Sequence, residues 1–330
     1  MTLHDMIRNS ISKCFLAYQM ASSRNTAIKN WIDRFIRENP PRAKSVVMTL
    51  FGDAITPHGG QVWLGSLIEL LAPFGISDRL VRTSVFRLAE EGWLDARRSG
   101  RRSLYALDPA AMSRFEHAYQ RVYAPTDREW DGQWTLVLAT SEDISMEQRA
   151  VLRKQLLWEG FGMLAPALYC HPSADERTLA EILERVGVMQ TVIISSAADS
   201  SSMHARPLRD LVAQCWQLES VVSDYEHYIA HFGSLPALLA KAGALDPQQA
   251  FVLRTLAIHA FRRVQLHDPQ LPLALLPAAW PGKTAYDLCH RIYAATFAAA
   301  ERHVLDALRR EDASAPIAAP YFYQRFGGLA

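Results

Sequence analysis

Apolar residues recur at helical spacing in the N-terminal part of the chain, over residues 26–39, 43–55, 62–73 and 77–91. The hydroxyl of Ser77 is suited to cap the last of these helices, and Gly92 stands where a helix commonly ends. The period then changes to two extended runs, 93–98 and 101–107, on either side of Gly100, which is a hairpin signal. Two helices joined by a short turn and followed by a basic hairpin predict a winged helix-turn-helix domain.

Strand-like and helical patterns alternate in the middle of the chain. Short extended runs at 133–140, 162–172 and 190–196 predict strands, and amphipathic runs at 145–160 and 175–187 predict helices. An order of strand, helix, strand, helix and strand with these lengths predicts a small ferredoxin-like α+β domain.

Helical spacing returns in the last third of the chain. We expect long helices at 208–232, 246–266 and 283–310, with a rigid proline-bounded connector between the last two and a loose tail after Glu311. The fold class is thus α+β and multidomain. Its predicted segments are an extension expected to be disordered (1–25), the winged helix-turn-helix domain (26–125), the ferredoxin-like domain (126–204), a helical C-terminal domain (205–312) and a tail (313–330).

Composition places the chain among globular proteins. Of its 330 residues, 49% are hydrophobic and 21% are charged, which is not the balance of a disordered protein. No apolar run is long enough to cross a bilayer, and the N-terminus has no clear signal-peptide cleavage site, so a membrane partner is not expected. The four scattered cysteines contain no C-x-x-C pair, which indicates reduced thiols in a cytoplasmic protein.

Positive charge is concentrated in the predicted helix-turn-helix and hairpin. Residues 75–107 contain seven arginines and four acidic residues, a local charge of +3, although the whole chain carries only +1. On the second helix Val81, Val85 and Leu88 share one face, which would dock the helix, while basic residues share another. A helix fits the major groove of B-DNA, where arginine is the commonest reader of guanine. The region therefore predicts binding to double-stranded operator DNA through Ser77, Arg79, Arg82, Thr83, Arg87, Arg97, Arg98, Arg101 and Arg102.

Two resemblances to known families agree with this interpretation. The stretch SDRLVRTSVFRLAEEG, residues 77–92, resembles the recognition helix of GntR-type repressors. A closer resemblance, to the PaaX family of phenylacetic acid degradation repressors, covers about residues 28–308. It rests on VVMTLFGDAITPHGGQVWLGSLIELLAPFGISDRLVRTSVFRLAEEGWL and on the later segments LRDLVAQCWQLESVVSDYEHYIAHF and HAFRRVQLHDPQLPLALLPAAWPG. The first 25 residues fall outside the family pattern.

The resemblance implies a homodimeric repressor of an aromatic, phenylacetate, catabolic operon. It also implies that an aryl-acyl-CoA thioester, phenylacetyl-CoA, is the effector and releases the protein from DNA. Such a ligand needs cations for its phosphates and an apolar aromatic pocket for its acyl group. The candidate set in the C-terminal half is Trp216, Tyr225, His259, Phe261, Arg262, Arg263 and Lys283. The aromatic residues are equally well interpreted as core, and the cations as solvated side chains.

An enzyme is the alternative that the sequence leaves open. The family's central domain resembles small CRISPR-associated ribonucleases, which place a catalytic acid at the end of the first strand. Here that strand contains no acid, and Glu142 and Asp143 only follow it, so we expect an inactive scaffold used for dimerisation rather than a nuclease. For a CoA-thioester hydrolase, no G-x-S-x-G motif is present. We therefore predict that the chain is not an enzyme and has no catalytic residues, no metal site and no prosthetic cofactor.

Overall fold

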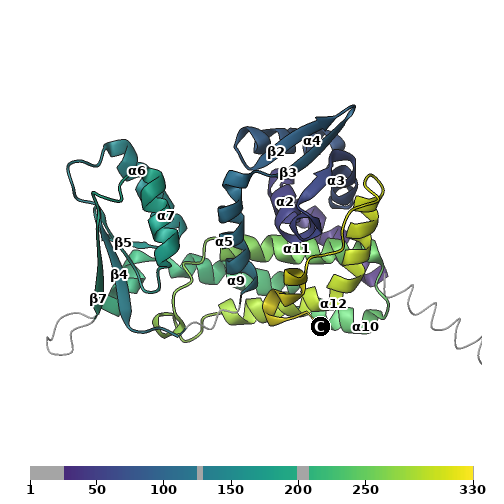
Figure 1. Cartoon of the computed structure of the whole chain (residues 1–330). Coiled ribbons are helices and arrows are strands. Elements are labelled where there is room, and N and C mark those ends of the chain that lie inside the picture. The colour runs from purple at the N-terminus through teal and green to yellow at the C-terminus, as the bar shows by residue number, and fades with distance from the viewer. Residues whose placement is uncertain (1–25, 125–128, 199–207, 330) are drawn as a thin grey trace, which may run out of the picture. The chain divides into compact units, whose positions relative to one another are not determined.

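A computed structural model of the chain describes residues 26–124, 129–198 and 208–329 (Figure 1). The predicted extension at 1–25 lies outside the described residues. Contacts divide the chain into two compact units, each assembled from segments that are distant in the sequence. The first unit comprises Met1–Ala124, Tyr228–Arg262 and Thr284–Ala330, and the second comprises Pro125–His227 and Arg263–Lys283.

The N-terminal part of the first unit is mainly helical and ends in an antiparallel hairpin and a further helix (Figure 1). A helix over residues 26–38 precedes α2 (Ala43–Leu50), β1 (Gln61–Trp63), α3 (Leu64–Leu71), α4 (Asp78–Glu90), β2 (Leu94–Ser99), β3 (Arg102–Leu107) and α5 (Met112–Tyr123). The three strands form one antiparallel sheet in the order β1-β3-β2. Helix α2 continues as a π-helical turn, Phe51–Ile55. The predicted helices and the predicted hairpin are thus present.

Strand β1 is a departure from the predicted pattern. The apolar spacing predicts a helix from Val62, but Val62 lies in a strand and pairs with Tyr105 of β3. Helix α3 begins only at Leu64. The hairpin offers β1 a free edge, and pairing with a strand some forty residues later overrides the local helical pattern. The helix prediction was therefore wrong for Val62 and Trp63, the two residues of β1 that it included.

The remaining helices of the first unit come from the C-terminal half of the chain. They are most of α11 (Pro247–Gln265) and α12 (Gly282–Arg309), the end of α9 (Leu218–Phe232), and α10 (Leu235–Ala242). Because the unit boundaries fall inside α9, α11 and α12, the segment predicted as one C-terminal domain, 205–312, is divided between the two units.

The C-terminal segment is packed, so the expectation of a loose tail was wrong. It contains a short 3-10 helical stretch, Pro320–Gly327, in which Phe322 and Phe326 are buried. The backbone N–H of Ala319 donates to the carbonyl oxygen of Pro57 at 2.9 Å. The aromatic side chains of this segment fill the interior of the first unit, and burial of that apolar surface stabilises a segment with little regular structure of its own.

A cluster of buried polar groups joins three distant parts of the first unit. Asp53 of the π-helical turn, Arg254 of α11 and Arg325 of the C-terminal segment are at most 1% exposed. Arg325 Nη1 donates to Asp53 Oδ1 at 3.0 Å, and Arg254 Nε lies 3.2 Å from Asp53 Oδ2. The hydroxyls of Tyr123 and Tyr293 donate to Asp53 Oδ1 at 2.6 and 2.8 Å. We call these five residues the Asp53 cluster.

Glu301 of α12 supplies a second carboxylate next to this cluster. Arg254 Nη1 donates to Glu301 Oε1 at 2.6 Å, and His58 Nε2 lies 2.9 Å from Glu301 Oε2. Burial alone would raise the pKa of Glu301, but the charge of Arg254 and the hydrogen bonds from His58 and Arg254 lower that pKa to about 2. The carboxylate is therefore ionised at neutral pH, and two carboxylates face two guanidinium groups.

The second unit is built on a four-stranded antiparallel sheet. Its elements follow in the order β4 (Gln133–Leu138), α6 (Met146–Trp158), β5 (Gly162–Ala165), β6 (Leu168–His171), α7 (Glu176–Val186) and β7 (Ile193–Ala198). The strand order β5-β6-β4-β7 is that of a ferredoxin-like fold. The single extended run predicted at 162–172 is in fact a hairpin of two strands, and Ala167 in its turn has a φ of 62°.

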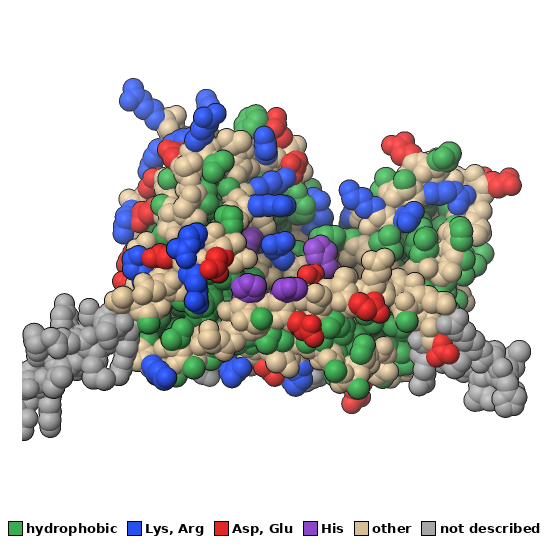
Figure 2. Space-filling model, turned by 180° about the vertical axis from the view of Figure 1, so that it is seen from behind, with side chains coloured by type: hydrophobic (Ala, Val, Ile, Leu, Met, Phe, Trp, Pro, Cys, Tyr) green, Lys and Arg blue, Asp and Glu red, His purple; other side chains and the backbone are tan. Residues whose placement is uncertain are grey.

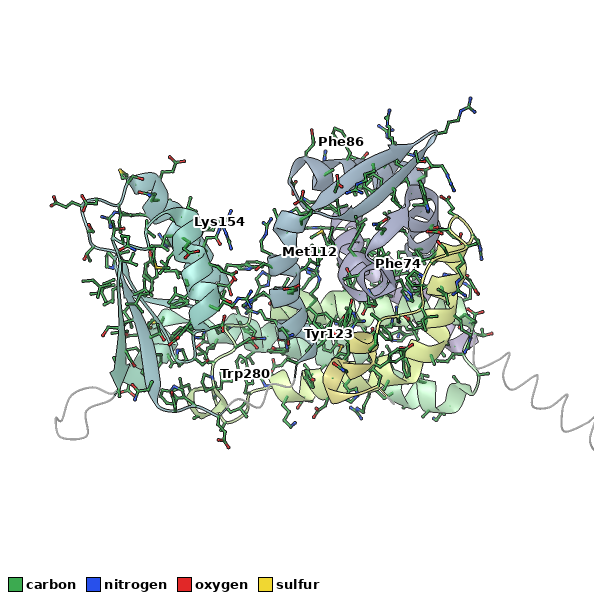
Figure 3. The ribbon with its side chains drawn as sticks, in the orientation of Figure 1. Phe74, Phe86, Met112, Tyr123, Lys154 and Trp280 are labelled. Carbon is green, nitrogen blue, oxygen red and sulfur yellow. The ribbon has the colours of Figure 1, made fainter. Side chains whose placement is uncertain are left out.

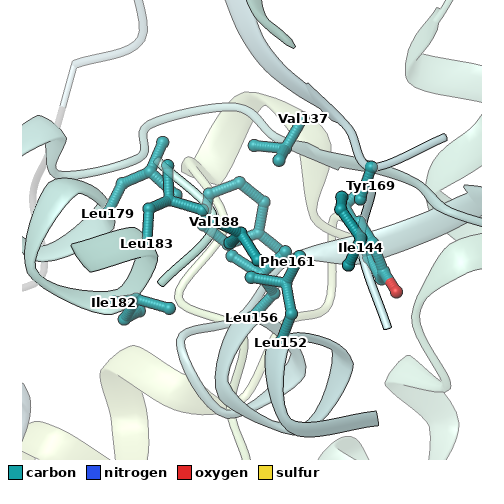
Figure 4. Packing of buried hydrophobic residues seen from close by; sticks show 11 residues of the cluster. Val137, Ile144, Leu152, Leu156, Phe161, Tyr169, Leu179, Ile182, Leu183 and Val188 are labelled. Carbon is teal, nitrogen blue, oxygen red and sulfur yellow. The ribbon is translucent and has the colours of Figure 1, made fainter. Parts of the chain in front are cut away.

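Helices α6 and α7 cover one face of this sheet. Their buried residues Leu152, Leu156 and Leu183 pack against Val137 of β4 and against Phe161 (Figure 4). Successive residues of a strand point to opposite faces, so Trp134 of β4 lies on the other face of the sheet.

That other face is covered by residues from outside the predicted ferredoxin-like segment. Trp134 packs with Val212 of α8 (Val212–Cys215), with Trp216 and with Leu271 of the proline-bounded connector. Trp216 has an extended backbone and its Nε1 donates to the carbonyl oxygen of Gly160 at 2.8 Å. The single helix predicted at 208–232 is therefore interrupted at Trp216, because its indole ring is inserted into this apolar layer.

The buried ion pairs of the first unit predict a large cost for replacing Arg325. Arg325→Met should lower the free energy of unfolding by about 3–5 kcal/mol, because Asp53 loses a charged partner in the interior. Arg310→Met is the matched control, since its ion pair with Glu69 is exposed and should be worth less than about 1 kcal/mol. Urea unfolding of both variants measures the difference, and equal midpoints would contradict this view of the Asp53 cluster.

Candidate nucleic-acid interface

Helix α4 is held in the first unit by one fully buried face. Val81, Val85 and Leu88 have no exposed surface. The hydroxyl of Ser77 accepts a hydrogen bond from the backbone N–H of Leu80 at 3.4 Å, which confirms the predicted cap. At the other end Gly92 has a φ of 69° and terminates the helix as predicted. The cap and the apolar face fix which side of the helix points outward.

The outward face of α4 is basic and exposed at Arg79, Arg82, Thr83 and Arg87. Arg82 donates to Asp78 through Nε at 2.5 Å and through Nη2 at 3.3 Å. This exposed contact uses Nε and Nη2 and leaves the N–H groups of Nη1 for a ligand. Sequence reasoning missed Asp78 as a positioning residue, although its spacing of four residues from Arg82 is the signal that would have found it.

The four arginines of the hairpin are all exposed, but they differ in their partners. Arg97 Nε pairs with Asp95 at 3.0 Å. Arg102 lies 4.2 Å above the ring of Trp63, and its Nη1 donates to the carbonyl oxygen of Glu311 at 3.2 Å. Within the described residues, Arg98 and Arg101 make no hydrogen bond or ion pair. Arg102 is therefore tied to the body of the unit, whereas its two neighbours are available to a ligand.

Charge on this end of the first unit suits a polyanion. Figure 2 shows lysine and arginine side chains projecting from the end that contains α4 and the hairpin, with acidic side chains interspersed. A helix with an exposed basic face beside a basic hairpin can enter a DNA groove while the hairpin contacts the phosphate backbone.

The seven candidate ligand residues are divided between the two units. In the second unit, Trp216 belongs to the apolar layer under the sheet. Tyr225 is fully buried, and its hydroxyl donates to Asp268 Oδ2 at 2.5 Å. Arg263 and Lys283 are exposed. The two aromatic residues thus have the surroundings of core residues, and the two cations lie on the surface.

The first unit contains the other three candidates. Phe261 has no exposed surface and packs against the rings of Tyr228 and Tyr286. His259 Nδ1 lies 2.9 Å from the hydroxyl of Thr49. Arg262 is half-buried, and its Nη2 donates to the carbonyl oxygen of Ser45 at 3.4 Å. Phe261 and His259 therefore contribute to the packing of the unit.

A cavity of about 130 Å³ lies within the first unit, and none of the seven candidates lines it. Its walls include His58, Val62, Trp63, Leu308 and Asp312. The cavity and the predicted ligand set therefore do not coincide.

The residues required for a nuclease are not brought together in the described part of the chain. Strand β4 ends at Leu138 without a carboxylate, and Glu142 and Asp143 are exposed in the loop before α6. No group of three or more His, Cys, Asp or Glu side chains is placed to hold a metal ion among the described residues. His227 and His231 of α9 are spaced four residues apart, which sequence reasoning overlooked, but within the described residues they belong to no such group.

Two further expectations were reduced cysteines and the absence of a membrane-spanning helix. Cys170, Cys215 and Cys289 are free thiols, and Cys14 lies outside the described residues. Among the helices that the structure describes, none has the length and apolar character needed to cross a membrane.

Comparisons with solved structures give a weak likeness. The chain matches uncharacterized protein Rv0674 from Mycobacterium tuberculosis with a TM-score of 0.47 and 27% identity. The match covers 78% of this chain and 98% of that one.

Comparisons of sequence give a family. Three family models match in succession: PaaX-like protein at residues 42–111, the PaaX protein central Cas2-like domain at 127–210 and the PaaX-like protein C-terminal domain at 216–306. The transcriptional repressor PaaX of Escherichia coli K12 is 38% identical over 303 residues, which is 92% of this chain and 95% of that protein. Since the matched segments include α4, the hairpin, the ferredoxin-like sheet and the C-terminal helices, the chain belongs to the PaaX family.

Proposed function

We propose that this chain is a transcriptional repressor that binds operator DNA through an N-terminal winged helix-turn-helix domain. The main support for this proposal is the structure of α4. This helix buries one face completely and exposes a basic face beside a hairpin with further exposed arginines. The name of the Escherichia coli relative, a transcriptional repressor, supports the same function.

In this proposal α4 enters the major groove and the hairpin lies along the phosphate backbone. Arg82, oriented by Asp78, binds the O6 and N7 atoms of a guanine. Arg79, Thr83 and Arg87 line the same groove, and Ser77 caps the end of the helix that enters it. Arg98 and Arg101 contact phosphates, while Arg102 holds the hairpin in position against Trp63.

The proposed effector is phenylacetyl-CoA or a similar aryl-acyl-CoA, and the proposed target is a phenylacetate catabolic operon. Both rest on the resemblance to the PaaX family. An effector releases a repressor only if it binds the DNA-incompetent arrangement more tightly than the competent one. Among the candidate cations, Arg263 and Lys283 are exposed and therefore suited to contact the phosphates of CoA.

The proposed active form is a homodimer on a two-fold-related operator. A single recognition helix contacts few base pairs, and paired modules on two half-sites give the selectivity that a repressor needs. The ferredoxin-like domain is the proposed dimerisation scaffold.

The groove-binding face predicts different effects for Arg82 and Arg101. Arg82→Ala should cost about 1–3 kcal/mol of affinity for the operator and relax specificity at one base pair. Arg101→Ala should weaken binding to all sequences and reduce the salt dependence by about one phosphate contact. Titrations of operator and random DNA at several salt concentrations test both. Arg102→Lys is a comparison variant in the hairpin. Unchanged operator affinity in Arg82→Ala would show that the wrong face of α4 has been assigned to DNA.

The dimer model predicts the mass and the footprint of the complex. Light scattering should report two chains at micromolar concentration. The protected operator should contain two half-sites separated by about one helical turn, 10–10.5 base pairs, or a multiple of it. A monomer that binds a single half-site one-to-one would contradict the model.

The effector model predicts release by the thioester alone. Phenylacetyl-CoA should dissociate the preformed complex at concentrations where free phenylacetate and CoA do not. Arg263→Glu should impair this release and spare operator binding, because a cationic contact to the CoA phosphates is lost. Arg262→Glu is a poorer test, since Arg262 also contacts Ser45. Release by free phenylacetate would refute the thioester model and leave the DNA-binding proposal intact.

A further inference from the structure

Phe86 is a large apolar residue that α4 leaves in solvent. Its exposed fraction is 60%, whereas Val81, Val85 and Leu88 of the same helix have no exposed surface. Figure 3 shows Phe86 at the end of the first unit opposite Tyr123, which lies in the interior. Single exposed apolar residues are common on protein surfaces, so the surroundings of Phe86 decide what its exposure means.

Those surroundings are the basic face of α4. Successive helical residues are about 100° apart around the helix axis. Seen down this axis, Phe86 points between Arg82 and Thr83, which lie one turn before it, and its direction differs by about 20° from that of Arg79. Arg87 follows on the same exposed side. Phe86 therefore stands on the exposed face of α4, with Arg82 one turn before it, Arg87 beside it and the exposed carboxylate of Glu90 one turn after it.

The charged side chains near Phe86 indicate what kind of surface its phenyl ring contacts. Arg82 and Arg87 lie within one turn of the ring and Arg79 lies two turns away, and these cations favour a surface that is dense in negative charge and has an apolar group within reach. The major groove of DNA fits both requirements, because the C5-methyl group of thymine is the apolar feature among its base edges. An apolar protein surface would leave the arginines without partners.

We propose that Phe86 reads thymine by packing against its C5-methyl group in the major groove. This inference rests on the proposed DNA-binding function and adds to it a specificity-determining residue. Four residues of helix separate Phe86 from Arg82, a rise of about 6 Å, which is roughly two base-pair steps of about 3.4 Å. The contacted thymine therefore lies within about two base pairs of the guanine bound by Arg82.

The experiment removes the methyl groups from the DNA and the ring from the protein. The fragment upstream of the gene for this chain is amplified once with dTTP and once with dUTP, so the two products differ only in the thymine C5-methyl groups. Wild-type, Phe86→Ala and Leu80→Ala proteins are titrated with each. Leu80 is the matched control: it is 52% exposed on the same helix, but about 120° away from Phe86.

Wild-type protein should bind the uracil fragment about fourfold more weakly for each methyl group that Phe86 buries. Phe86→Ala should bind the thymine fragment more weakly than wild type and should lose less affinity than wild type on the uracil fragment. Leu80→Ala should distinguish them as wild type does. This cycle isolates the contact between ring and methyl group from any general effect of uracil on DNA flexibility, which would weaken all three proteins equally.

Two results would overturn the inference and leave the proposed DNA-binding function standing. One is equal binding of both fragments by the wild-type protein. The other is a Phe86→Ala variant that still loses affinity on the uracil fragment as the wild type does. Failure of the wild-type protein to bind even the thymine fragment would overturn the proposed function together with the inference. Equal melting temperatures of wild type and Phe86→Ala verify that the substitution leaves the fold intact.

Discussion

The carboxylate of Asp53 is the constraint on which the first unit depends. It is buried, so it requires partners of opposite charge, and these come from α11 and from the C-terminal segment. Asp53 has both of its charged partners only when all three segments are in place. Helix α2 leads into the π-helical turn that carries Asp53, and α2 packs against α4. The position of the basic helix therefore depends on residues at the far end of the chain.

Arginine has three different uses in this unit, and each follows from its surroundings. Arg254 and Arg325 neutralise buried carboxylates. Arg102 is exposed but anchors the hairpin through Trp63 and Glu311. Arg98 and Arg101 keep their donors for a ligand. The local charge of +3 over residues 75–107 therefore does not tell which arginines keep free donors, because Asp78, Asp95 and Trp63 each take up one of them.

The central sheet shows why a domain boundary is hard to place from sequence. Strand β4 buries Val137 on one face and Trp134 on the other. A sheet with two apolar faces needs two covering layers. Helices α6 and α7 form one layer and follow directly in the sequence, as the helical pattern predicts. The second layer includes Trp216 and Leu271, which lie beyond the predicted end of the domain at residue 204.

The sequence by itself determined the elements whose signals are local. The cap at Ser77, the glycine at the end of α4, the turn at Gly100 and the two helices of the central domain depend on signals within a few residues, and each was confirmed. Only the tertiary structure decided that Val62 lies in a strand, that Trp216 breaks a helix and that the C-terminal segment is buried. These outcomes depend on pairing and burial between residues far apart in the chain, and a helical or alternating period contains no information about such partners.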